Sequence, residues 1–179
     1  MGCAEALRPM KREVPSRWIV LALLILALAL RFYRLDAQSL WYDEGTSVAL
    51  AGRSLATITR HAAADIHPPF YYYLLHLWVI PFGTSEAAVR ALSALAGTAL
   101  VALTFLLGRR LFGTTAGLVA ALLSALSPFQ VYYSQETRMY ILVALLGALS
   151  VYLFLGMVDR ETGKQGNRET GKQGNRETG

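Results

Sequence analysis

Charge and cysteine are both scarce in this chain. Only 16% of its 179 residues are Asp, Glu, Lys or Arg, against about 25% in an average soluble domain. The single cysteine, Cys3, excludes an internal disulfide and a zinc site built from several thiolates. The net charge of +5 needs no nucleic acid to explain it, since the basic residues gather beside apolar segments. These shortages argue against a soluble domain, a disulfide scaffold and a nucleic-acid-binding protein.

Three stretches carry no charged residue and are long enough to cross a membrane. They are residues 91–108, 111–135 and 139–158. A crossing helix needs roughly 17–25 apolar residues. A shorter apolar run over residues 18–30 reaches that length if the Arg residues at its two ends extend their charges toward the membrane surfaces. Its basic flank also fits a signal peptide, but no small-residue cleavage site follows the run, which favours an uncleaved helix.

The part between the first two long apolar segments has two sections. Residues 44–63 predict an amphipathic helix on the membrane surface, with apolar side chains along one face: Val48, Ala51, Leu55 and Ile58. Residues 70–78 are rich in Tyr and Trp, which favour the headgroup level, and Pro81 follows too soon for a full crossing. We interpret this aromatic section as interfacial or re-entrant.

The placement of Lys and Arg predicts the topology. With a cytoplasmic N-terminus and no crossing by the aromatic section, most bases lie inside, including the short loop with Arg109 and Arg110. We therefore predict an all-α fold, a polytopic transmembrane helix bundle with about four crossings and juxtamembrane amphipathic helices in the first outer loop. Residues 1–17 form a basic cytoplasmic N-terminus, 18–158 the membrane domain, and 159–179 a disordered tail that repeats GKQGNRET.

The outer face in this topology collects five residues that can carry chemistry: Asp43, Glu44, His67, Glu136 and Arg138. A carboxylate can take a proton from a hydroxyl, and a cation can stabilise a departing phosphate. A histidine with carboxylates could ligate a divalent cation. Structural roles explain the same residues. Asp43 could cap the surface helix with Glu44 at its positive end, His67 could belong to a turn, and Glu136 and Arg138 to a solvated lip. From the residues alone, both interpretations stay open.

Four sequence blocks carry a resemblance to a known family. In chain order they are WYDE (41–44), HPPFYY (67–72), GRRLFG (108–113) and SPFQVYYSQETRMY (127–140). Their order and spacing resemble the N-terminal part of a C-type (GT-C) glycosyltransferase. The nearest branches are the dolichyl-phosphate-mannose-protein mannosyltransferase-like and the lipopolysaccharide-core enzymes. The resemblance covers residues 18–157 and leaves out the repeat tail.

The resemblance implies an inverting enzyme of the cell membrane. It would transfer a sugar from a polyprenyl-phosphate donor to a lipid, glycan or protein acceptor at the outer face. Membrane lipids would be further partners, and no nucleic acid would be bound. It assigns catalysis to Asp43 with Glu44 beside it, and donor-phosphate binding to Glu136 and Arg138. Some relatives hold a metal at the position of His67, which makes a divalent metal ion the candidate cofactor.

The length of the chain leaves a second hypothesis open. Members of the family usually have eight or more crossings, so the resemblance also implies the front part of a longer enzyme. The alternative is a small non-enzymatic membrane protein or an inactive remnant. The order of the blocks favours enzyme ancestry, and the smaller number of crossings favours the alternative.

Overall fold

The computed structural model describes residues 16–64 and 69–177, and this part of the chain is helical without any β-strand. The predicted all-α membrane bundle is confirmed. Its helices are α1 (Ser16–Phe32), α2 (Tyr42–Ala51), α3 (Leu55–Ala63), α4 (Phe70–Phe82), α5 (Glu86–Phe112), α6 (Thr114–Leu126), α7 (Pro128–Ser134) and α8 (Tyr140–Glu177).

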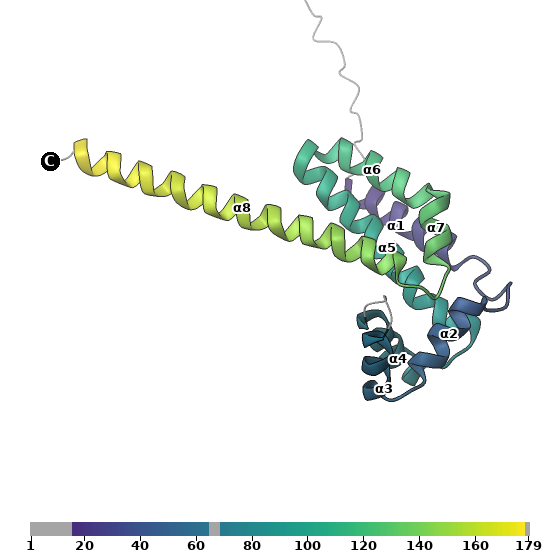
Figure 1. Ribbon diagram of the computed structural model, residues 1–179. Coiled ribbons are helices and arrows are strands. Elements are labelled where there is room, and N and C mark those ends of the chain that lie inside the picture. Colours follow the sequence, from purple (N-terminus) through teal and green to yellow (C-terminus); the bar gives the residue numbers. More distant parts are fainter. Residues whose placement is uncertain (1–15, 65–68, 178–179) are drawn as a thin grey trace, which may run out of the picture.

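Helix α5 is the centre of the bundle. It packs against α1, α4, α6, α7 and α8. The short helices α2, α3 and α4 gather near one end of α5, while α8 projects away from the other helices (Figure 1). One apolar core joins α1, α5 and α6, and a second joins α2, α4 and α5. The first consists of Ala27, Val101, Phe105, Ala121 and Ala125, and the second of Ala51, Tyr71, Leu75 and Val89.

Two glycines let α5 and α6 approach each other closely. A Cβ atom on Gly117 would lie 2.8 Å from the backbone nitrogen of Arg109 and 2.8 Å from the carbonyl oxygen of Phe105. A Cβ atom on Gly108 would lie 2.9 Å from the Cα atom of Gly117. Small residues at such crossings allow backbone-to-backbone contact, which is how helices associate within a membrane.

The lengths of the helices bear on the number of crossings. Helix α5 has 27 residues and the apolar part of α8, Tyr140–Arg160, has 21, and both are long and apolar enough to span a bilayer. Helices α6 and α7 qualify together but meet at an angle of 60°. The break follows from Ser127, whose side chain caps α7, and from Pro128 in the first turn of α7. Helix α1 has 17 residues, so the count of four crossings stays a prediction.

The segment between α1 and α4 differs from its prediction in one respect. The single amphipathic helix expected over residues 44–63 is wrong, because the chain forms two helices there, α2 and α3. Gly52 ends α2, and the Ser54 side chain accepts a hydrogen bond from the Thr57 backbone nitrogen and begins α3. The serine cap supplies the helix start, and glycine at the preceding helix end has a low helix propensity. The expected apolar face is therefore divided between two helix axes.

The aromatic section forms α4, which has 13 residues with Pro81 inside it. At 1.5 Å per residue, such a helix is about 20 Å long, shorter than the roughly 30 Å hydrocarbon core of a bilayer. Its His76 ring contacts the carbonyl oxygen of Ala51 at 2.7 Å and so joins α4 to the end of α2. The length of α4 agrees with the interpretation of an interfacial or re-entrant segment.

Arg31 departs most from its sequence-based interpretation. Instead of extending its charge to a membrane surface, its side chain is fully buried at the end of α1. It donates hydrogen bonds to the carbonyl oxygens of Ser124 and Ala125, at the end of α6, and to the hydroxyl of Ser134. The last carbonyls of a helix lack intrahelical partners and carry partial negative charge, so a buried guanidinium is stabilised there.

The tail lies within the range of α8, whose backbone continues through Glu177. The disorder that low hydrophobicity and the GKQGNRET repeat predict for residues 159–179 stays a prediction. Once a long helix exists, each added residue gains one hydrogen bond without a new nucleation step. Lys, Gln, Arg and Glu in the repeat are also good helix formers.

Candidate functional site

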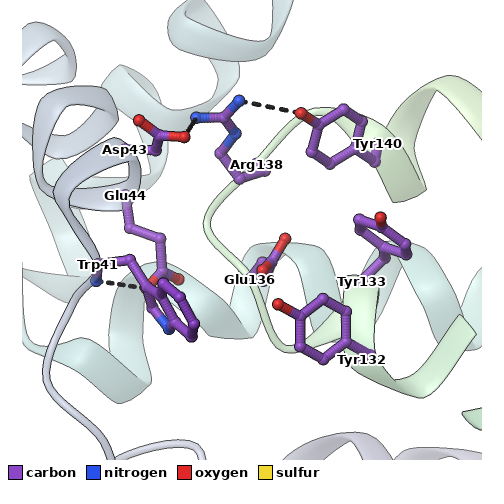
Figure 2. A pocket seen from close by; sticks show the side chains of 8 residues that line it. All are labelled: Trp41, Asp43, Glu44, Tyr132, Tyr133, Glu136, Arg138 and Tyr140. Carbon is purple, nitrogen blue, oxygen red and sulfur yellow. Dashed lines mark hydrogen bonds and ion pairs between the residues drawn. The ribbon is translucent and has the colours of Figure 1, made fainter. Parts of the chain in front are cut away.

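A polar cavity of about 200 Å³ lies where α2 begins and where α7 passes into α8 (Figure 2). Its side chains come from two sequence blocks that are far apart in the chain. The lining residues are Trp41, Asp43 and Glu44 from the first block, and Tyr132, Tyr133, Glu136, Arg138 and Tyr140 from the second. The fold thus brings together four of the five residues singled out from the sequence.

Asp43 and Arg138 form an ion pair across this cavity. The Oδ2 atom of Asp43 lies 2.9 Å from Nη1 of Arg138. The Asp43 side chain is 64% exposed, whereas that of Arg138 is 17% exposed. The other Arg138 amino group, Nη2, donates to the hydroxyl of Tyr140 at 3.0 Å. An exposed carboxylate therefore stands beside a cation that is held in place by an aromatic side chain.

The environment of Arg138 keeps its guanidinium charged. Burial alone lowers its pKa, but the hydrogen bond to Tyr140 and the charge of Asp43 raise the pKa above its ordinary value overall. The guanidinium carbon also lies 5.3 Å from the centre of the Tyr140 ring, close enough for a cation–π contact. The cavity has a permanent positive charge at this point.

Glu44 has a different environment, although it is the neighbour of Asp43 in sequence. Its side chain is buried, and each carboxylate oxygen accepts two hydrogen bonds. Oε1 accepts from Nε of Arg90 at 3.0 Å and from the backbone nitrogen of Thr137 at 2.7 Å. Oε2 accepts from Nη2 of Arg90 at 2.7 Å and from the backbone nitrogen of Trp41 at 3.0 Å. No lone pair remains for a substrate proton.

These contacts also decide the charge of Glu44. Burial by itself raises its pKa, but the hydrogen bonds from Arg90, Thr137 and Trp41, together with the charge of Arg90, lower the pKa below its usual value. Glu44 is therefore an anion that joins the start of α2 to α5 and to the segment before α8. It also closes the first turn of α2 through the Trp41 backbone, so the capping role that the alternative interpretation gave to Asp43 belongs to Glu44.

Arg90 is a part of this arrangement that sequence reasoning missed. Besides Glu44, it donates to the carbonyl oxygens of Leu35, Gln38 and Ser39, in the connection between α1 and α2. The sequence feature that could have revealed its role is the position of a lone arginine immediately before the uncharged stretch 91–108. In such a place a charge costs free energy unless it is paired, so a buried partner was to be expected.

Glu136 lies on the wall of the cavity near Tyr132 (Figure 2), and its carboxylate raises the pKa of the Tyr132 hydroxyl above its ordinary value. Both residues beside Glu136 in sequence are fixed. The Gln135 side chain donates to the carbonyl oxygens of Leu30, Arg31 and Tyr33, and the Thr137 backbone donates to Glu44. The loop that presents Glu136 is thus fastened on both sides.

His67 lies outside the described residues, so its metal-binding role stays a prediction. Among residues 16–64 and 69–177, no group of three His, Cys, Asp or Glu side chains could hold a metal ion. The donor chemistry of the cavity agrees, because Asp43 faces Arg138 and all four lone-pair positions of Glu44 are occupied. These residues do not fit a divalent cation, and no step through a metal is derived from them.

A second, apolar cavity of about 330 Å³ adjoins the polar one between α5, α7 and α8. Tyr133 and Tyr140 line both, and their rings meet edge to face with centres 5.2 Å apart. The remaining lining residues are Leu100, Phe129, Gln130, Ile141 and Ala144. A charged site and an apolar site therefore share one tyrosine wall.

Comparison with protein families shows the family of this chain. Residues 66–166, more than half of the chain, match the family described as dolichyl-phosphate-mannose-protein mannosyltransferase. The chain belongs to this family. Membership indicates a membrane-embedded glycosyltransferase of the GT-C type, which confirms the resemblance found in the sequence blocks. No curated protein and no solved structure matches the chain.

The extent of the match matters for individual residues of this mannosyltransferase-family protein. It includes Glu136, Arg138 and the cavity tyrosines, but it begins after Asp43 and Glu44. The evidence that Asp43 belongs to the same site is therefore its ion pair with Arg138.

Proposed function

We propose that this protein transfers a sugar from a polyprenyl-phosphate carrier to an acceptor hydroxyl. The ion pair of Asp43 and Arg138 carries this proposal, because it places an exposed carboxylate and a charged guanidinium side by side in one cavity. The acceptor oxygen attacks the anomeric carbon and its proton passes to Asp43. The bond from that carbon to the phosphate oxygen breaks, and Arg138 stabilises the charge on the departing lipid phosphate. Attack opposite the leaving group inverts the anomeric carbon.

The two adjoining cavities support a lipid-linked donor over a soluble one. A phosphate bound at Arg138 lies beside the tyrosine wall, and the apolar cavity begins on the other side of that wall. An isoprenoid chain bound in the apolar cavity contacts only apolar and aromatic side chains for most of its length. A nucleotide in the same place would put polar groups against Phe129 and Ile141. The acceptor in this proposal is a lipid, a glycan or a protein.

A transfer assay tests this function. Native membranes that contain the protein and supply acceptors are incubated with decaprenyl phosphate carrying radiolabelled mannose, glucose or arabinose. We expect label to leave one of these lipids and to appear in a new product, with release of decaprenyl phosphate. Membranes without the protein are the control. Absence of transfer from every lipid, together with transfer from a labelled nucleotide sugar, would contradict the proposal, and no transfer at all would favour a non-enzymatic protein.

We further propose that the cavity opens at the outer face of the membrane, with the N-terminus in the cytoplasm. In a Cys3→Ala background, Thr46→Cys on α2 should react with a membrane-impermeant maleimide added to intact cells. Thr114→Cys, at the start of α6, should react only after the cells are opened. Both side chains are exposed, so accessibility reports the side of the membrane. Labelling of Thr114→Cys in intact cells would overturn this topology.

A further inference from the structure

The cavity has two polar walls. One is the Arg138 guanidinium with its partners Asp43 and Tyr140, and the other is the Glu136 carboxylate facing Tyr132 (Figure 2). Arg138 is the only cation among the lining residues. Within the described part of the chain, no Lys or Arg forms an ion pair with Glu136. Glu136 thus adds to the cavity a negative charge that has no ion-pair partner among the described residues.

Charge excludes Glu136 as a ligand of the donor phosphate. Two like charges at 4 Å repel by about 1 kcal/mol in water and by about 4 kcal/mol at the dielectric of a protein surface. A phosphate in this cavity therefore lies on the side of Arg138, whose guanidinium offsets the charge of Asp43, and away from Glu136. The sequence-based prediction assigned both Glu136 and Arg138 to the phosphate. By this argument only Arg138 binds it, and Glu136 has a different role.

Glu136 has the chemistry of a receptor for hydroxyl groups. An ionised carboxylate only accepts hydrogen bonds, and its two oxygens can accept from neighbouring hydroxyls at once. Hydrogen bonds from O–H to a carboxylate are short and about twice as strong as neutral ones. Tyr132 adds a hydroxyl beside it, and Trp41 adds an aromatic surface to the same cavity. Aromatic faces attract the positively polarised C–H groups of a neutral, hydroxyl-rich ligand.

The position of Glu136 is also fixed enough for recognition. The neighbouring residues Gln135 and Thr137 are bound to the end of α1 and to Glu44. The loop therefore cannot shift easily to accommodate a sugar with a different arrangement of hydroxyls. Preorganised acceptors of this kind discriminate strongly against ligands that leave them unpaired.

We propose that Glu136, with Tyr132 beside it, binds the hydroxyl groups of the donor sugar and selects which sugar is transferred. This assignment rests on the proposed function, because it places a lipid-linked sugar in the cavity. It makes Glu136 a specificity-determining residue, while Arg138 binds the phosphate common to all such donors.

Binding measurements separate the two roles. The full chain in lipid nanodiscs is titrated with decaprenyl phosphate and with decaprenyl phosphate carrying mannose, glucose or arabinose. Glu136→Gln should weaken binding of at least one sugar-bearing lipid by about 10- to 100-fold, the range for hydrogen bonds to a charged group. Its binding of decaprenyl phosphate should be unchanged or tighter. Arg138→Gln should weaken binding of every lipid that carries a phosphate.

The controls keep this proposal distinct from the proposed function. Unchanged binding of decaprenyl phosphate shows that the Glu136→Gln variant is folded, and Glu86→Gln, at the start of α5 and outside the cavity, should alter no lipid affinity. The proposal is overturned if Glu136→Gln weakens the binding of decaprenyl phosphate as much as Arg138→Gln does. It is also overturned if every sugar-bearing lipid binds Glu136→Gln as tightly as it binds the unmodified protein. These titrations need no turnover, so a failed transfer assay does not decide them.

Discussion

Asp43→Asn should reduce sugar transfer by about 10²- to 10⁴-fold, the usual contribution of a general base. The amide keeps nearly the same volume and can still accept a hydrogen bond from Arg138, so the cavity retains its shape. It cannot accept the proton that the acceptor hydroxyl loses. The measurement is the rate of label transfer from the lipid-linked sugar at saturating donor, with donor affinity determined in parallel.

Asp36→Asn is the matched control for this variant. Asp36 is an exposed carboxylate in the connection that precedes α2, outside the cavity, and it receives the same chemical change. Its transfer rate should equal that of the unmodified protein. Near-normal transfer by Asp43→Asn would exclude Asp43 as the general base, without any bearing on the sugar-binding role of Glu136. A loss of donor affinity without a loss of maximal rate would make Asp43 a binding residue.

Glu44→Gln should destabilise the protein by about 3–5 kcal/mol, the cost of breaking a buried ion pair from one side. The side chains of Glu44 and Arg90 are 2% and 5% exposed, so the guanidinium would keep a buried charge without a counterion. Unfolding in mixed micelles with increasing dodecyl sulfate, followed by tryptophan fluorescence, measures this change. Replacement of both residues by Leu should recover part of the loss, because no lone charge then remains buried.

The ion pair of Arg110 and Asp159 offers a control of the same charge type at the surface. The Asp159 side chain is 69% exposed, so Asp159→Asn should cost no more than about 1 kcal/mol. The pH dependence gives an independent check. The contribution of Glu44 should be complete above about pH 4.3, the ordinary carboxyl pKa, and fall as the pH drops through its lower folded value. Equal costs for the buried and exposed pairs would contradict the structural role of Glu44.

The helical character of the chain follows from its sequence, because uncharged stretches of crossing length have few other ways to satisfy their backbone in a membrane. The breaks are harder to predict. Gly52 and Ser54 divide one amphipathic pattern into two helices, although the spacing of apolar residues continues across them. At Ser127 and Pro128 the hydropathy also continues, and the bend comes from the serine cap and from the proline in the first turn of α7.

The candidate site was predictable as a set of residues but not as a set of roles. Asp43 and Glu44 are chemically equivalent in the sequence, and only tertiary contacts separate the exposed one from the buried one. The partners of Glu44 come from α5 and from the segment before α8, and no local pattern connects these positions. Burial of Arg31 was missed for the same reason, since its partners lie on α6 and α7.

The four hydrogen bonds to Glu44 impose an order on biosynthesis. Its carboxylate and the Trp41 amide leave the ribosome first, Arg90 follows, and Thr137 comes last. A nascent chain that ends before Thr137 therefore carries an incompletely satisfied anion at the membrane surface, with Asp43 still without Arg138. Assembly of the cavity is thus coupled to synthesis of the segment between α7 and α8, and the Asp43 carboxylate acquires its cation only after this segment has joined α2.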